Sequence, residues 1–206
     1  MKLYDLERSG NCYKIRLFLS LLGLEYSSIP INPGAGENRT NEFLAMNPNG
    51  LVPVLIDGEN TIYDSVAILS YLAKKYADED WFPADPQLFS MVIRWLAFEQ
   101  SEGRYGLARA RVISLNISSF LARTGTLEES QEIGRSALAI LNMQLTKTTW
   151  LAGTTQATIC DIACYPYTAM CGDGGLSLEL FPAVKRWIND VKGLKGYIEL
   201  PGKNNV

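Results

Sequence analysis

The chain has 206 residues, 47% of them hydrophobic, and a formal net charge of −3, so it can bury a core for one or two domains and has no electrostatic footprint for nucleic acid. It contains no histidine, which excludes His-based catalytic triads, His general bases and His-ligated metal sites. No apolar run reaches the roughly 18 residues of a membrane span, and charges follow the first residue at once, so we expect a cytoplasmic protein without a secretory signal.

Residues 1–78 alternate between strand and helix patterns. A short strand at residues 2–4 is followed by an amphipathic helix whose apolar stripe covers residues 15–22. A second strand over residues 25–29 meets Pro30, which either confines it to the edge of a sheet or ends it. With the hairpin that follows, this order predicts a mixed sheet with a parallel start and an antiparallel end.

The hairpin over residues 54–63 carries the most informative residues at its two ends. The Val52–Pro53 bond before it is a candidate for the cis form, which would turn the backbone N–H and C=O of Val52 outward, free to pair with a peptide-like ligand. Asp64 and Ser65 begin the next helix, where unpaired N–H groups and a partial positive charge suit a carboxylate. We therefore expect a site for a small anionic peptide. The inner face of that helix is predicted to carry Val66, Leu69, Ala73 and Tyr76.

The chain beyond the hairpin helix shows only helix signals, and we place an all-helical domain at residues 86–206. Gly103 and Gly106 are expected to bend or interrupt its first helix. Thr158 and Asp161 match a capping box, in which two side chains satisfy the free N–H groups of a helix start. The cysteines form no C-x-x-C pair and are expected to be buried structural thiols: Cys12, Cys160, Cys164 and Cys171.

With these motifs in this order, the chain resembles the glutathione transferase family over nearly its whole length. Residues 9–15 are similar to the active-site turn of that family, residues 47–55 to its cis-proline segment and residues 64–69 to its γ-glutamyl-binding motif. The capping box at residues 158–161 is similar to the one in its helical domain. The resemblance implies a thioredoxin-like α/β N-terminal domain at residues 1–78, an all-α C-terminal domain, a homodimer, and glutathione as co-substrate without a metal.

The resemblance assigns binding roles position by position. Val52, held by Pro53, would pair through its backbone with the cysteinyl residue of glutathione. Asp64 would accept a hydrogen bond from the γ-glutamyl ammonium. The hydroxyl and N–H of Ser65 would hold the γ-glutamyl carboxylate; the alternative for Ser65 is a simple helix cap.

The residue that activates the thiol stays open between Ser9 and Asn11. Ser9 aligns with the serine of serine-type members, and Asn11 with the asparagine of a bacterial branch of the family. The alternative for Asn11 is the N-cap of the following helix. Cys12 takes the fourth position of the family's C-x-x-C frame, where it would at most resolve a disulfide that Ser9 cannot start.

The resemblance says less about the remainder of the site. Leu51 departs from a basic residue often found in the family, and Asn38 is a candidate replacement contact for the glycyl end of glutathione. Tyr105 and Arg111 are candidates for the second-substrate pocket, with solvated or interface side chains as the alternative. For Arg109 that alternative is preferred.

We therefore expect a glutathione transferase that activates the thiol of glutathione for attack on a small electrophile, a detoxification reaction. The alternatives are a glutathione-dependent disulfide reductase or peroxidase and a non-catalytic glutathione-binding interaction module. The expected partners are glutathione, the electrophile and a second copy of the chain, with no nucleic acid and no membrane.

Overall fold

The structure of the protein is a computed structural model that describes residues 1–117 and 119–201, and the chain divides into two compact units. Of the described residues, the first unit contains Met1–Asp78 and residues 194–201, and the second contains those of Glu79–Gly193. No helix in the described part of the chain is long and apolar enough to cross a membrane.

The C-terminal segment differs from the sequence-based expectation, which placed all of residues 86–206 in the helical domain. Ser20 donates a hydrogen bond of 2.7 Å to the carbonyl of Gly196, and the Tyr13 hydroxyl donates to the carbonyl of Ile198. These bonds attach the last described residues to the first unit. They join residues far apart in the sequence, so no local sequence pattern predicts them.

The first unit is built on a four-stranded sheet. Its strands are β1 (Lys2–Asp5), β2 (Ser27–Pro30), β3 (Val54–Asp57) and β4 (Asn60–Tyr63), in the spatial order β2-β1-β3-β4. β1 and β2 are parallel, whereas β3 is antiparallel to both β1 and β4. Pro30 ends an edge strand, where its missing N–H costs no ladder hydrogen bond. The mixed, thioredoxin-like sheet expected from the sequence is confirmed.

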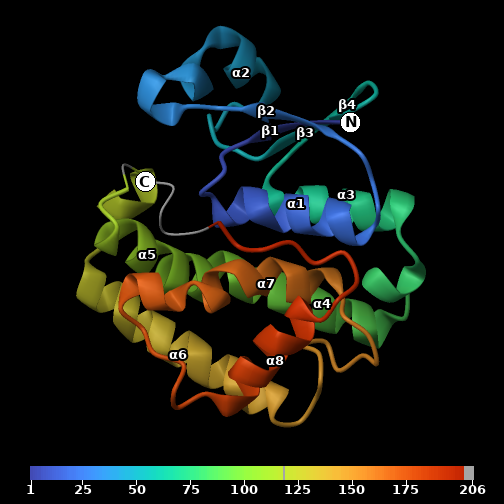
Figure 1. Ribbon diagram of the computed structural model, residues 1–206, viewed down its shortest axis with the longest axis vertical. Helices are drawn as coiled ribbons and strands as arrows, with labels where there is room; N and C mark the ends of the chain where they lie inside the picture. Colours follow the sequence, from blue (N-terminus) through green and yellow to red (C-terminus); the bar gives the residue numbers. More distant parts are fainter. Residues whose placement is uncertain (118, 202–206) are drawn as a thin grey trace. The chain divides into compact units, whose positions relative to one another are not determined.

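Three α-helices cover this sheet. α1 (Gly10–Leu21) and α3 (Ser65–Tyr76) lie along one face, and α2 (Asn41–Met46) lies on the other side, after the 3-10 turns η1 (Pro33–Ala35) and η2 (Glu37–Arg39) (Figure 1). The α2 side is anchored by Phe43, whose ring meets the edge of Tyr4 with centroids 6.0 Å apart. The sheet and its helices thus hold the loops at the ends of the strands.

The expected inner face of α3 is wrong at Tyr76. Its side chain is exposed, and its hydroxyl donates to Asp57 Oδ2 at 2.6 Å. The same oxygen accepts from the Tyr71 hydroxyl and the Lys75 ammonium, both at 2.7 Å. Leu72 takes the buried position instead. Tyr76 lies outward because its hydroxyl is satisfied at Asp57, which ties the C-terminal half of α3 to the end of β3.

The second unit is helical throughout its described residues. Its α-helices are α4 (Pro86–Phe98), α5 (Arg109–Ser114), α6 (Leu127–Leu145), α7 (Ile159–Ala169) and α8 (Pro182–Lys192), with the 3-10 turns η3 (Glu79–Trp81), η5 (Phe120–Arg123) and η6 (Cys171–Gly174). Between α4 and α5 the chain runs as a π-helix, η4 (Glu99–Ala108). The interruption expected at Gly103 and Gly106 is therefore a change of helix type.

Close packing explains why Gly106 is needed within η4. A Cβ atom at this position would lie 2.7 Å from the backbone nitrogen of Gly134 in α6. The two glycines let the backbones of η4 and α6 approach each other more closely than side chains would allow.

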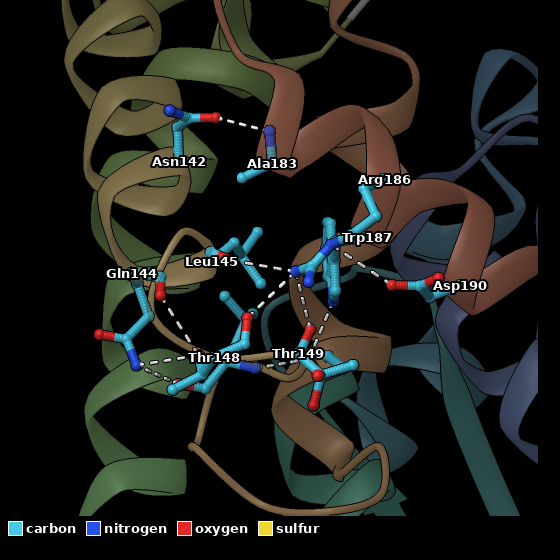
Figure 2. A network of polar contacts seen from close by, with 11 residues as sticks. Asn142, Gln144, Leu145, Thr148, Thr149, Ala183, Arg186, Trp187 and Asp190 are labelled. Carbon is cyan, nitrogen blue, oxygen red and sulfur yellow. Dashed lines mark hydrogen bonds and ion pairs between the residues drawn. The ribbon is translucent and has the colours of Figure 1, made fainter.

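The last helix is attached to α6 through backbone carbonyls. Figure 2 shows Arg186 donating to the carbonyls of Leu145 and Thr148, both at 3.0 Å, and of Thr149 at 3.3 Å. At the start of α8, Asn142 Oδ1 accepts the N–H of Ala183 at 2.9 Å. One arginine thus satisfies the carbonyl of the last residue of α6 and two carbonyls of the segment that follows it.

Candidate functional site

Three segments meet at one end of the sheet in the first unit. They are the N-terminal turn (residues 9–15), the cis-proline loop (residues 47–53) and the α3 start (Asp64–Ser65). Tyr4 of β1, Val54 of β3 and Tyr63 of β4 occupy neighbouring positions across three adjacent strands. The nearer end of each segment lies within five residues of one of these positions, so the sheet brings the three segments together.

Ser9 begins the N-terminal turn as the N-cap of α1. Its hydroxyl oxygen accepts the N–H of Cys12 at 3.3 Å, which satisfies one of the free donors of the helix start. Within the described part of the chain its own O–H makes no hydrogen bond, so it can still donate to a ligand. The N-cap role considered for Asn11 therefore belongs to Ser9.

Asn11 lies in the first turn of α1 and is half-buried. Its Oδ1 accepts a hydrogen bond of 2.8 Å from the ammonium of Lys14. Lys14 is fully buried. The Asn11 amide therefore has its acceptor occupied.

Cys12 is fully buried in the same turn. Its sulfur accepts the N–H of Leu6 at 3.4 Å. Burial, with the nearby carboxylate of Asp5, raises the pKa of the Cys12 thiol to about 12. The thiol is therefore protonated at neutral pH and poorly placed for redox chemistry. The other three cysteines are also buried, as expected, and none forms a disulfide bond within the described part of the chain.

The Val52–Pro53 peptide bond is cis, as the sequence suggested. Among the described residues, neither the N–H nor the C=O of Val52 has a hydrogen-bond partner. The buried Asn47 supports the loop before them: its Nδ2 donates to the carbonyl of Leu51 at 2.7 Å, and its Oδ1 accepts the N–H of Asn49 at 3.0 Å. The backbone of Val52 is thus held and free to pair with an extended peptide.

Asn38 supports the cis-proline loop from η2. Its Nδ2 donates to the carbonyl of Gly50 at 2.7 Å, while its buried Oδ1 has no partner among the described residues. Because a buried polar atom without a partner is costly, this oxygen is suited to accept an N–H from a ligand. The atom that Asn38 offers is an acceptor, which does not suit direct contact with a carboxylate.

Arg39, which the sequence did not point to, lies beside the same loop. Its Nη1 donates to the carbonyl of Asn49 at 3.3 Å, and a Cβ atom added at Gly50 would lie 2.5 Å from this nitrogen. Arg39 is exposed, and no described residue forms an ion pair with it. Its guanidinium places a positive charge beside the backbone of Asn49 and Gly50, just before Leu51, the position that lacks the basic residue often found in the family. In the sequence, the role of Arg39 could have been suspected only because it is a basic residue directly after Asn38.

The α3 start has an unusual backbone. Asp64 has a φ of 71°, in the left-handed region that residues other than glycine rarely adopt, and its Oδ1 accepts the N–H of Val66 at 2.9 Å. Asp64 is exposed, whereas Ser65 is almost fully buried at the first position of α3. Such strain at a helix N-terminus is typical of a ligand site.

The second unit contains the other predicted site residues. Arg111 is 5% exposed and its Nε lies 3.1 Å from Asp173 Oδ2, so the guanidinium is committed to a buried ion pair. Arg109 donates to Ser130 Oγ at 2.7 Å and to the carbonyl of Thr124 at 2.9 Å, a structural role. Tyr105 is 39% exposed and can contact a ligand. Burial of Arg111 follows from its carboxylate partner 62 residues later in the chain, which no local pattern shows.

Comparison with known proteins agrees with this geometry. Residues 1–74 match the family model described as the glutathione S-transferase, N-terminal domain. A zeta-class glutathione S-transferase from Euphorbia esula is 48% identical over 85 residues, which cover 41% of this chain and only 38% of that relative. Glutathione S-transferase 3 from Zea mays is 30% identical over 158 residues, which cover 74% of this chain and 70% of that relative.

A solved structure is similar over the whole length. The crystal structure of a glutathione S-transferase from Pseudomonas fluorescens has 34% sequence identity and a TM-score of 0.88, and the match covers 98% of both chains. Identity at this level across both units shows more than a shared fold, and we conclude that the chain belongs to the glutathione S-transferase family.

Proposed function

We propose that this protein is a glutathione transferase that binds glutathione at the end of the sheet and stabilises its thiolate for attack on a small electrophile. The sulfur forms a bond to the electrophilic carbon, and the leaving group departs with its bonding electron pair. The observation that carries the proposal is the convergence of the N-terminal turn, the cis-proline loop and the α3 start on neighbouring positions of β1, β3 and β4.

The proposed binding mode uses backbone and side-chain groups of these segments that can still pair with a ligand. The backbone of Val52, beside Pro53, pairs with the cysteinyl residue. The carboxylate of Asp64 accepts from the γ-glutamyl ammonium, and Ser65 holds the γ-glutamyl carboxylate at the helix N-terminus. The unpartnered Oδ1 of Asn38 supports a contact with a ligand N–H.

Thiolate stabilisation at the N-terminal turn needs no base. A free thiol has a pKa of about 8.5, and lowering it by about two units requires roughly 2.7 kcal/mol. One charge-assisted hydrogen bond from Ser9 or Asn11 contributes about 1.5–3 kcal/mol. The N-terminus of α1 adds about 0.5–1 kcal/mol. These two contributions are sufficient without histidine.

The structure favours this reaction over a disulfide exchange that depends on Cys12. A resolving cysteine must reach a mixed disulfide as a thiolate, whereas Cys12 is fully buried with a raised pKa. Conjugation should survive the Cys12→Ser change. Loss of a reductase activity in that variant, with conjugation absent in the wild type, would instead favour the reductase.

A cytoplasmic homodimer and an electrophile contact at Tyr105 complete the proposal. Tyr105 supports that contact because it is an exposed aromatic side chain, whereas Arg111 is held by Asp173. Light scattering after size-exclusion chromatography measures the oligomeric state, and a monomer at micromolar concentration would contradict the dimer.

Retention on immobilised glutathione tests the site itself. We expect the wild type to be retained, and Asp64→Ala with Ser65→Ala to abolish retention while far-ultraviolet circular dichroism stays unchanged. Glu132→Ala, which removes an exposed carboxylate from α6, is the matched control and should be retained. Titration of the bound thiol by its ultraviolet absorbance separates the enzyme from a non-catalytic binding module, because only the enzyme should lower the thiol pKa.

A further inference from the structure

Lys14 is a buried charged residue that the proposed reaction does not yet use. Lys14 lies on α1 three positions after Asn11, and no part of it is exposed to solvent. Lysine is almost never fully buried, because removing its ammonium from water is costly unless that group is hydrogen-bonded. Its ammonium donates a hydrogen bond of 2.8 Å to Asn11 Oδ1, and this bond determines how the Asn11 amide is oriented.

The chemistry of the ammonium decides which way the Asn11 amide faces. An ammonium has three donors and no acceptor, so only the amide oxygen can lie against it. The amide N–H₂ group must then lie on the opposite side, where it can only donate. Glutamine or serine in place of Lys14 would not impose this orientation, because both can donate and accept.

A donor is what a thiolate needs. The Ser9 hydroxyl accepts the N–H of Cys12 and keeps one O–H donor, whereas the Asn11 amide has its acceptor held and both N–H bonds free of described partners. A bond from a charged donor to the amide oxygen also polarises the amide and strengthens its N–H groups as donors. Asp5, the carboxylate of β1, is ion-paired with Arg16 on α1.

We propose that Lys14 is a positioning residue that orients the Asn11 amide so that its N–H₂ group stabilises the thiolate of bound glutathione. The proposal rests on the proposed function. It favours Asn11 over Ser9 as the main donor to the sulfur, with Lys14 acting through the amide.

A double-mutant cycle on the thiol of bound glutathione tests this coupling. Lys14→Met should raise the thiol pKa by about one unit, which lowers kcat/KM about tenfold at a pH well below both thiol pKa values and about threefold at neutral pH. The difference should vanish at a pH above both thiol pKa values, where the thiol ionises in either protein. Lys14→Arg should restore the wild-type profile because guanidinium also only donates. Lys74→Met, a lysine-to-methionine change on α3, is the matched control and should leave the profile unchanged.

The decisive comparison is the effect of Lys14→Met in two other backgrounds. With Asn11→Ala, the change at Lys14 should add nothing to the thiol pKa; with Ser9→Ala, it should retain its full effect. An equal rise in the Asn11→Ala background would show direct action of the charge and overturn the proposal. A wild-type pKa in Lys14→Met would overturn it too, as would a kcat/KM loss of equal size at every pH.

Two measurements keep these outcomes interpretable. Thermal unfolding checks each variant, and Lys14→Gln, which keeps a polar group, replaces Lys14→Met in the cycle if methionine prevents folding. Wild-type binding and thiol titration are measured first. Their failure would overturn the proposed function together with this inference, whereas a normal wild type with an uncoupled Lys14 would overturn the inference alone.

Discussion

The buried carboxylate of Asp161 should contribute more to the stability of the second unit than any exposed ion pair. At the start of α7, its Oδ1 accepts the N–H of Leu151 at 2.9 Å and the indole N–H of Trp187 at 3.0 Å. Its Oδ2 accepts the N–H of Thr158 at 2.9 Å and the Thr158 hydroxyl at 3.1 Å. One side chain thereby connects α7, α8 and the segment before α7.

The Asp161→Ala change leaves three fixed, buried N–H donors without a partner. Each unsatisfied donor costs about 1–3 kcal/mol, and the Thr158 hydroxyl can turn to Cys160 Sγ, 3.0 Å away. Removing the carboxylate also removes the cost of its burial, which raises the pKa of Asp161. We therefore expect a net loss of about 3–5 kcal/mol in the free energy of unfolding. That loss corresponds to a fall in Tm of roughly 10 °C or more.

The Asp161→Asn change should cost about half as much. Its amide oxygen can keep the bonds to Leu151 and Trp187, while its N–H₂ group faces the N–H of Thr158, donor against donor. Urea denaturation followed by tryptophan fluorescence measures both variants, with Glu132→Ala as the exposed control. A loss below 1 kcal/mol for Asp161→Ala, or equal losses for both variants, would refute the reasoning that unsatisfied N–H groups set the cost.

Three further changes test other contacts. The donors around Asp57, first the Lys75 ammonium, hold its pKa at about 2 in the folded state. The contribution of Asp57 to stability is therefore present above its ordinary pKa of about 3.8 and is lost as the pH falls towards 2. Acid titration of Tm should show a smaller fall over this range in Asp57→Asn than in the wild type, and identical curves would contradict the assignment. Arg186→Met should lower the free energy of unfolding by about 1–3 kcal/mol, because one carbonyl at the end of α6 and others just after it lose their donor (Figure 2). A salt-sensitive loss of the same size would point to its ion pair instead. Gly106→Ala should cost about 1–3 kcal/mol by overpacking, because the added methyl meets the backbone of Gly134. An unchanged urea midpoint would show that η4 and α6 can separate.

Local chemistry determined much of this protein from its sequence. The hairpin between Pro53 and Asp64, the capping box at Thr158 and the edge strand before Pro30 were predictable, because each depends on hydrogen bonds or backbone angles within a few residues. The absence of histidine excluded His-based catalysis, and the order of the motifs indicated the class of reaction. These local features are enough to indicate the glutathione transferase family without any long-range contact.

Only the tertiary structure decided which donor and acceptor groups of the predicted site residues are free for a ligand. Pairing of β1, β3 and β4 brings the three segments of the proposed site to one end of the sheet. Folding also buries Arg111 against Asp173 and turns the donor of Asn38 to Gly50. Whether a side chain's polar atom is free depends on partners distant in the sequence, and that dependence is the physical reason why the motifs alone could not assign them.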